Sequence, residues 1–335
     1  MDEARAFWVV APGRGEIRAQ RLRSLALGEL LIRARASAIS RGTETLVFRG
    51  EVPQSEWQRM RCPFQEGEFP GPVKYGYAVA GVVEDGPAEL CGRRVFCLHP
   101  HQDRFIVSED AVVVIPDDVP DRRATLAANM ETAINGLWDG APGLGDRIAV
   151  VGAGVVGGLM AGLASRLPGA EVELIDIDPS RATLAAALGC RFAPPQQARG
   201  EADLVIHASG APEGLVTALA IAGFEATVIE MSWYGTRVVP LALGGGFHSR
   251  RLTLRSSQVG AVPPGRRERW SRRRRLELAL SLLRDPVFDL LLSGETDFSA
   301  LPELMALLAA SSAGVLCHTV RYDRRRRAEL CTVLR

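Results

Sequence analysis

The stretch Arg147-Ile148-Ala149-Val150-Val151-Gly152-Ala153-Gly154-Val155-Val156-Gly157 lies near the middle of the chain and decides its fold. The apolar run before the first glycine predicts a buried parallel strand, and residues 159–164 predict a helix. The G-x-G-x-x-G turn between them brings backbone N–H groups and a helix N-terminus against a dinucleotide pyrophosphate. We therefore expect a dinucleotide-binding loop at Gly152, Gly154, Val155, Val156 and Gly157.

An acidic residue follows at the spacing typical of this motif. Residues 172–176 predict a second strand that ends at Asp176, about 20 residues after the glycines. A carboxylate there accepts hydrogen bonds from free ribose hydroxyls and repels a 2′-phosphate, which favours NAD(H) over NADP(H). Arg181, the first arginine after Asp176, is included with the cofactor-binding residues. The alternative is a Rossmann-like domain that binds another nucleotide.

The mid-chain position of the glycine loop predicts a separate domain before it, because this motif usually opens its own domain. We expect a β-rich domain over residues 1–121, a doubly wound α/β domain over 122–262, and a return segment over 263–335 that ends in a loose tail. One helix is expected over 121–138, and two more over 272–283 and 301–310.

The composition excludes several classes of protein. The 335 residues carry a net charge of +1, so nothing indicates a nucleic-acid partner. The start lacks a signal-peptide core, and the longest apolar run contains the glycines of the fingerprint, so no membrane partner is expected. The cysteines show no metal-finger spacing, and we expect a reduced, cytoplasmic protein.

Two further motifs carry a family resemblance. The stretches Ala38-Ile39-Ser40-Arg41-Gly42-Thr43-Glu44 and Gly76-Tyr77-Ala78-Val79-Ala80-Gly81-Val82-Val83-Glu84, together with the glycine loop, resemble the medium-chain dehydrogenase/reductase family. This resemblance implies an α/β protein with a GroES-like catalytic domain and a Rossmann domain with a doubly wound parallel sheet. It also implies a small-molecule substrate and a homodimer or tetramer.

The chain departs from the family where its zinc enzymes hold their metal. By the resemblance, Ser40 replaces the first catalytic zinc ligand, Tyr77 the second and Ala127 the third. Stable zinc sites use Cys, His or carboxylate ligands, so this set does not fit zinc. The four-cysteine structural lobe is also missing after Cys97. We expect no metal, as in bacteriochlorophyllide dehydrogenase-like members of the family.

Polar residues near these positions are the candidates for catalysis. Tyr77 can exchange a proton in place of the metal, or simply pack between sheet and loop, and Ser40 can contact substrate or cap a helix. His99 suits a proton relay, although a solvated loop histidine or a metal site shared with His101 are alternatives. The full set of catalytic candidates is Ser40, Thr43, Glu44, Lys74, Tyr77, His99, Asn129 and Glu131.

The resemblance also implies cofactor contacts outside the glycine loop. These positions border the pyrophosphate, the adenosine-side ribose and the nicotinamide, and they are Arg41, Ser209, Gly210, Met231, Ser232 and His318.

Together these features predict an NAD(H)-dependent, zinc-independent oxidoreductase that interconverts a secondary alcohol and a ketone on a polar small molecule. One alternative is a reductase of an activated C=C bond. Another is a non-catalytic NAD-binding sensor that kept the fold and lost the site.

Overall fold

The computed structural model describes residues 3–311 and 314–322. The chain forms two compact units: the first contains Met1–Ala128 and Leu292–Arg335, and the second contains Asn129–Leu291. The return to the first unit thus begins at Leu292 rather than at residue 263, and the expected loose tail lies outside the described residues.

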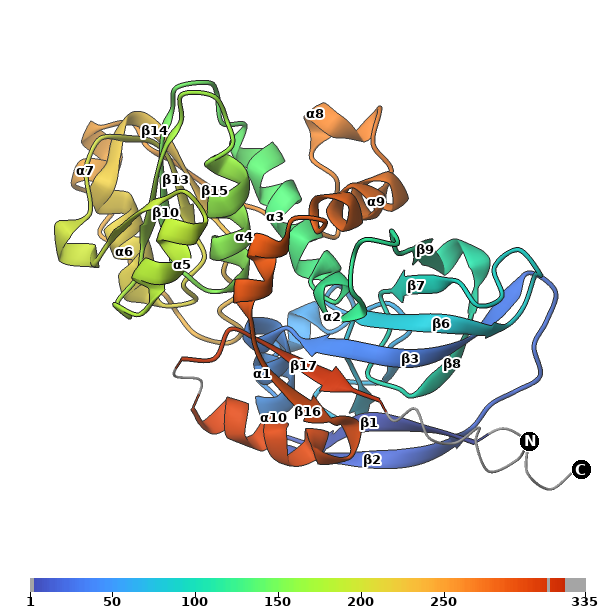
Figure 1. Cartoon of the computed structure of the whole chain (residues 1–335). Coiled ribbons are helices and arrows are strands. Elements are labelled where there is room, and N and C mark those ends of the chain that lie inside the picture. Colours follow the sequence, from blue (N-terminus) through green and yellow to red (C-terminus); the bar gives the residue numbers. More distant parts are fainter. Residues whose placement is uncertain (1–2, 312–313, 323–335) are drawn as a thin grey trace, which may run out of the picture. The chain divides into compact units, whose positions relative to one another are not determined.

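The second unit is built on a six-stranded sheet in which every pairing is parallel (Figure 1). The strands run in the order β12-β11-β10-β13-β14-β15. From β10 the chain first adds strands toward one edge of the sheet (β11, β12) and then, from β13 on, toward the other edge. Doubly wound sheets bind ligands at this switch point, in the crevice outside the carboxyl ends of the strands. The strands are β10 (Arg147–Val151), β11 (Glu171–Ile175), β12 (Arg191–Ala193), β13 (Ala202–His207), β14 (Ala222–Glu230) and β15 (Thr253–Ser256).

Helices connect these strands and cover the sheet. Two of them, α4 and α6, pack directly against the central strands. The helices are α3 (Ala127–Gly140), α4 (Val155–Ala164), α5 (Arg181–Ala187), α6 (Pro212–Ile221), α7 (Gly246–Ser249), α8 (Pro264–Arg267) and α9 (Arg272–Leu282), with 3-10 turns η3 (Pro195–Gln197) and η4 (Pro286–Leu291).

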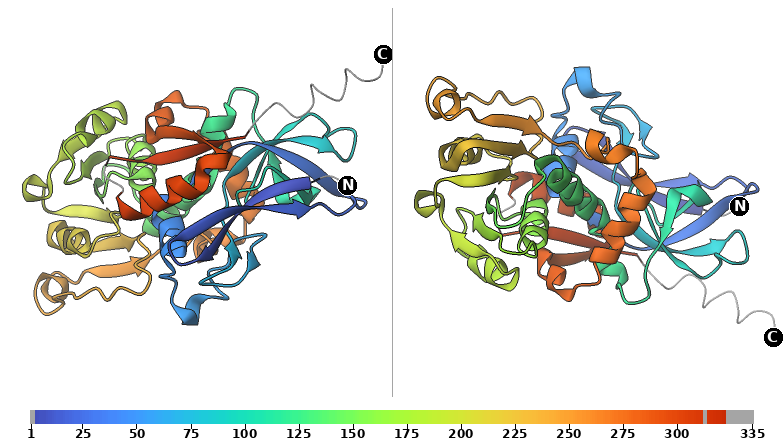
Figure 2. Two further views of the ribbon diagram at one scale, coloured as in Figure 1. Left: turned by 90° about the horizontal axis from the view of Figure 1, so that it is seen from below. Right: turned by 90° about the horizontal axis from the view of Figure 1, so that it is seen from above.

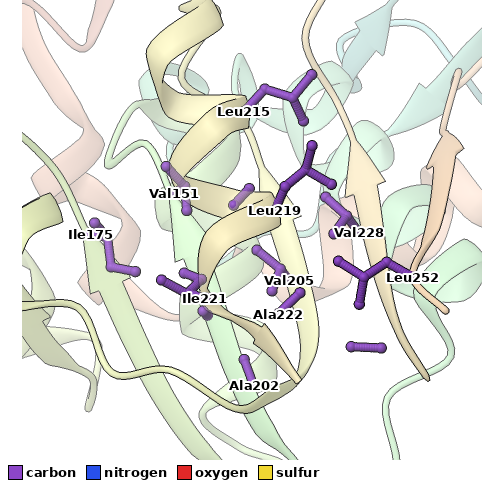
Figure 3. Close-up of a cluster of buried hydrophobic side chains, with 13 residues drawn as sticks. Val151, Ile175, Ala202, Val205, Leu215, Leu219, Ile221, Ala222, Val228 and Leu252 are labelled. Carbon is purple, nitrogen blue, oxygen red and sulfur yellow. The ribbon is translucent and has the colours of Figure 1, made fainter. Parts of the chain in front are cut away.

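The core between α6 and the sheet is made of aliphatic side chains. Leu215 and Leu219 of α6 lie against Val205 and Val228 of the sheet, and each of these four is at least nine-tenths buried (Figure 3). Strands β10 and β13 are buried almost throughout because both faces of the sheet are covered there, which explains why the sequence shows continuous apolar runs at these strands.

The first unit combines a seven-stranded sheet with a four-stranded one. The larger sheet contains β3 (Glu29–Ile39), β6 (Val79–Asp85), β7 (Arg94–Cys97), β8 (Arg104–Ser108), β9 (Val112–Val114), β16 (Leu292–Asp297) and β17 (Cys317–Arg321). The smaller contains β1 (Glu3–Ala11), β2 (Arg14–Arg21), β4 (Glu66–Gly67) and β5 (Val73–Lys74). The sequence did not predict β2 or β16, because both are rich in polar residues.

Short helices complete the first unit. Helix α10 lies beside the β1–β2 hairpin (Figure 2). The elements are α1 (Arg41–Arg49), α2 (Asp121–Ala124) and α10 (Leu301–Ala310), with 3-10 turns η1 (Gln54–Glu56), η2 (Glu109–Ala111) and η5 (Phe298–Ala300). No helix within residues 3–311 and 314–322 is long and apolar enough to cross a membrane.

The fold class expected from the sequence is confirmed, but one helix differs. The single helix predicted over 121–138 is two helices, α2 and α3. At the break, the Thr125 hydroxyl donates a hydrogen bond to the carbonyl oxygen of Arg122 at 2.7 Å. Such side-chain bonds compete with the helical backbone pattern, which accounts for the interruption.

A buried ion pair explains why residues 263–291 belong to the second unit and not to the first. Arg275 of α9 donates to Glu131 of α3 at 2.8 Å, and neither side chain is more than 5% exposed. Arg275 also donates to Asn135 and to the carbonyl oxygen of Val259. These bonds attach α9 to the second unit, although its sequence reads only as an arginine-rich surface helix.

We predict that Arg275→Met lowers the free energy of unfolding by about 3–5 kcal/mol, because Glu131 then stays buried without its partner. Urea unfolding followed by tryptophan fluorescence measures this loss. The control is Arg273→Met on the same helix, whose exposed pair with Glu277 contributes only about 0.5 kcal/mol. Equal effects of the two substitutions would contradict the structural role of Arg275.

A second prediction concerns the contact between α4 and the glycine loop. A Cβ on Gly157 would lie 1.8 Å from the carbonyl oxygen of Gly152, whereas one on Gly154 would have no neighbour within 4 Å. Gly157→Ala is therefore expected to destabilise the protein by about 1–3 kcal/mol. Gly154→Ala should leave the unfolding midpoint in the same titration unchanged, and a similar loss in both variants would argue against this packing.

Candidate active site

The glycine loop joins β10 to α4 at the carboxyl edge of the parallel sheet. Gly152 has φ +107°, a value that favours glycine, and a Cβ there would lie 2.5 Å from the Ser209 nitrogen. Gly154 precedes the first residue of α4, and the space around its Cα is open. The loop therefore leaves room for a pyrophosphate in front of a helix N-terminus, so its residues fit a dinucleotide.

Asp176 follows β11 at the same edge and faces the glycine loop. Its carboxylate accepts hydrogen bonds from the Ala153 N–H at 2.6 Å and from the Asp178 N–H at 2.9 Å. These two donors fix the carboxylate beside the loop, where ribose hydroxyls can reach its remaining lone pairs. Arg181 pairs with Asp178 at 3.4 Å instead of approaching Asp176.

The ends of β13 and β14 carry a polar cluster beside the loop. His207 is fully buried, and it contacts Glu230 through Nδ1 at 2.8 Å and the Ser209 hydroxyl through Nε2 at 2.6 Å. Tyr234 donates to Glu230 at 3.1 Å, and burial together with this carboxylate raises the pKa of Tyr234 above its usual value. The expected cofactor residue Ser209 is therefore part of a hydrogen-bonded network.

The other cofactor candidates of the second unit lie close to this cluster. The Gly210 N–H donates to the Ser232 hydroxyl at 3.1 Å, which joins the two loops. The Ser232 N–H in turn donates to Glu230 at 2.7 Å. Met231 packs on α3, where a Cβ on Gly136 would meet its sulfur at 2.6 Å.

In the first unit, Tyr77 contacts two other catalytic candidates. Its hydroxyl is hydrogen-bonded to the side chains of Ser40 and Thr43 at the start of α1. Burial, with Glu44 nearby, raises the pKa of Tyr77 above its usual value, so the phenol stays neutral at physiological pH. Ser40 precedes α1 but makes no side-chain cap bond, which disagrees with the helix-cap interpretation.

A buried relay runs from Glu44 into the sheet. Glu44 accepts from the Ser40 N–H at 2.7 Å and contacts His101 Nε2 at 2.9 Å. His101 Nδ1 contacts the Ser37 hydroxyl at 2.7 Å, which in turn contacts the Tyr322 hydroxyl at 2.9 Å. Because a carboxylate only accepts, a neutral His101 has its proton on Nε2, facing Glu44, and its Nδ1 accepts a hydrogen bond from the Ser37 hydroxyl.

Lys74 and His99 lie outside this relay. Lys74 donates to Glu66 and, at 2.8 Å, to Gln102. His99 stacks on Phe105 with 3.8 Å between ring centroids and donates from Nδ1 to the Pro100 carbonyl oxygen at 2.9 Å. Burial lowers the pKa of His99 to about 3, so it holds no positive charge at neutral pH. Both residues have structural partners that account for their burial.

The remaining candidates lie on α3, β17 and α1. The pairing of Glu131 with Arg275 gives this acid a structural role, and burial raises its pKa against the effect of that arginine. Asn129 is buried on α3. His318 on β17 contacts the Thr296 hydroxyl at 2.7 Å, and burial lowers its pKa. Arg41 opens α1.

The residues at the family's zinc positions do not fit that metal. Ser40 and Tyr77 offer neutral hydroxyls, and Ala127 offers no donor. Zinc in proteins is held by thiolate, imidazole or carboxylate groups. In the described part of the chain, no group of three or more His, Cys, Asp or Glu side chains could hold a metal ion.

Sequence reasoning missed five members of these two networks, and they are Ser37, Tyr322, His207, Glu230 and Tyr234. His101 was considered as a pocket residue beside His99 and as a possible metal ligand, but not as a partner of Glu44. A signal was present, since His207 and Glu230 each end an apolar strand run in a doubly wound sheet. Residues at that edge of such a sheet border its ligand site.

No family model matches the chain. D-guloside 3-dehydrogenase of Escherichia coli K12 is 25% identical over 293 residues, which cover 78% of this chain and 83% of that protein. Among solved structures, an alcohol dehydrogenase of Escherichia coli CFT073 complexed with NADH superposes with a TM-score of 0.75 at 15% identity, covering 96% of this chain and all of that one.

A third similar protein is a putative zinc-binding dehydrogenase of Sinorhizobium meliloti bound to NADP, with a TM-score of 0.76 at 17% identity over 96% of this chain and all of that one. These similarities agree with the two-unit architecture and with the glycine loop before α4. The chain has the fold of the medium-chain dehydrogenase/reductase family.

Proposed function

We propose that the protein is an NAD(H)-dependent oxidoreductase that interconverts a secondary alcohol and a ketone without zinc. The observation that carries this proposal is the Tyr77 hydroxyl, hydrogen-bonded to Ser40 and Thr43 where zinc enzymes of this fold place ligands. A polyhydroxylated substrate is supported by the similarity to D-guloside 3-dehydrogenase.

The proposed preference for NAD(H) over NADP(H) is based on Asp176. Its carboxylate is held by two backbone N–H groups beside the glycine loop, which favours free ribose hydroxyls and disfavours a 2′-phosphate. Arg181 forms its ion pair with Asp178, at 3.4 Å. When bound, NAD supplies the hydride acceptor and NADH the hydride donor. The similar Sinorhizobium meliloti structure is bound to NADP, so the preference for NAD(H) is tested below.

Proton transfer is assigned to the hydroxyl cluster of the first unit. Tyr77 stays protonated at neutral pH and so can donate a hydrogen bond to a carbonyl oxygen, the role that a Lewis acid fills in zinc enzymes. Ser40 and Thr43 orient this phenol. Glu44 and His101 behind them provide a buried acceptor pair that can relay a proton.

The preference for NAD(H) gives a direct test. Losing hydrogen bonds to a charged partner costs about 1.5–3 kcal/mol, so Asp176→Ala should weaken NADH binding by roughly 10- to 100-fold. The same substitution should weaken NADPH binding less, because the repulsion also disappears. Isothermal titration gives both affinities. Glu171→Ala removes the same charge at the other end of β11 and should change neither. Tighter binding of NADPH than NADH by the unaltered protein would refute the assignment.

The role of Tyr77 is tested by removing only its hydroxyl. Tyr77→Phe is expected to lower kcat/KM for reduction of a ketose or keto-glycoside by about 10²-fold or more, with NADH affinity unchanged. Tyr75→Phe makes the same change in a ring 6.0 Å away, and activity should persist.

Dialysis against a strong chelator supplies a second measurement on the same protein. Activity should survive it, since the residues at the zinc positions do not fit the metal. Loss of activity that returns with added zinc would overturn the zinc-free mechanism. NADH binding without turnover across a broad panel of carbonyl compounds would favour a sensor.

A further inference from the structure

The ends of β13 and β14 bring a serine, a histidine and a glutamate into one hydrogen-bonded line. The Ser209 hydroxyl lies 2.6 Å from His207 Nε2, and His207 Nδ1 lies 2.8 Å from Glu230. Glu230 only accepts, so Nδ1 carries the proton and Nε2 presents its lone pair to the serine. With a neutral imidazole the Ser209 O–H can donate to Nε2 at 2.6 Å, the shorter of its two acceptor contacts, the other being the Ala211 carbonyl oxygen at 3.4 Å.

The acid of this line is held in place from two sides. The Ser232 N–H donates to Glu230 at 2.7 Å, and the Tyr234 hydroxyl donates to it at 3.1 Å. His207 itself is fully buried and the Glu230 side chain is 11% exposed. Fixed partners of this kind hold a histidine in one tautomer and one orientation.

The exposure of its serine distinguishes this Ser209–His207–Glu230 chain of hydrogen bonds from a similar one in the first unit. Ser37, His101 and Glu44 form the same sequence of contacts at 2.7 and 2.9 Å, but Ser37 is completely buried and no reagent can reach it. Ser209, by contrast, is exposed on the loop before α6. Of the two serines, only Ser209 is an exposed residue.

We propose that Ser209 is a nucleophile toward activated carboxylic esters and organophosphorus electrophiles. Its oxygen attacks the carbonyl carbon while its proton passes to His207 Nε2. The alkoxide or phenoxide leaves and takes that proton, and an acyl group remains on Ser209. Water, deprotonated by His207, then hydrolyses the acyl-serine and releases the carboxylic acid. The activity does not involve hydride transfer.

The neighbouring amides restrict the substrates to activated ones. The Gly210 N–H already donates to Ser232 at 3.1 Å, and the Ala211 N–H already donates to the Ser209 oxygen at 3.1 Å. Neither amide is free to stabilise an oxyanion, a contribution of roughly 10²–10³-fold in serine hydrolases. Amides and unactivated esters are therefore outside the proposed range.

The test is covalent labelling of the full-length protein, without added nucleotide, by a fluorophosphonate probe, followed by peptide mass mapping. We expect a single-site adduct on Ser209 and slow release of p-nitrophenol from p-nitrophenyl acetate. His207→Gln and Glu230→Gln should each slow both reactions, by about 10²-fold for the histidine. Ser209→Ala should abolish the adduct.

The control is Ser180→Ala, which alters an exposed serine whose N–H donates to Asp178, and it should label like the unaltered protein. No adduct on Ser209 in the unaltered protein would overturn the proposal, whatever the variants do. Labelling of Ser209 that persists at the same rate in a folded His207→Gln variant would also overturn it. NADH turnover is a separate readout, so failure of one activity does not imply failure of the other.

Discussion

The close approach of α4 to the end of β10 is the constraint on which the second unit depends. The space between Gly157 and the Gly152 carbonyl is too small for any side chain, and Gly152 itself lies against the Ser209 backbone. Because the loop is pressed against both neighbours, its N–H groups have fixed positions, and one of them orients Asp176. The proposed preference for NAD(H) thus depends on packing as well as on charge.

Local sequence patterns were sufficient to predict the elements of the second unit, but not the residue at which this unit ends. The apolar strand, glycine turn and acid lie within a short segment, so the sequence predicted them and the fold class. Residues 263–291 were assigned to the first unit because the character of the sequence changes after Pro263-Pro264. Their place depends on the bond from Arg275 to Glu131, which are 144 positions apart, and no local pattern reports such a contact.

The same distinction applies to the candidate site. Tyr77 and Ser40 were found because, by the resemblance, they stand at zinc-ligand positions of the family, and Thr43 was found because it lies in the same motif as Ser40. Ser37 and Tyr322 were not, since their bond joins residues 285 positions apart and each looks like an ordinary strand residue. Lys74 and His99 were selected by residue type, yet Gln102 and Phe105 account for their burial. The type of a side chain shows which reactions it can take part in, but its packing in the fold decides whether it is placed to do so.

The pairing of β17 with β3 has a consequence for biosynthesis. Residues 317–321 complete the sheet of the first unit by pairing with a strand that ends at Ile39, and the whole second unit lies between them in the chain. During translation all residues of the second unit are synthesised before β17, so at that stage β3 of the N-terminal sheet still lacks this partner strand. The order of synthesis thus favours the nucleotide-binding half folding first, with the N-terminal half waiting for its last strand.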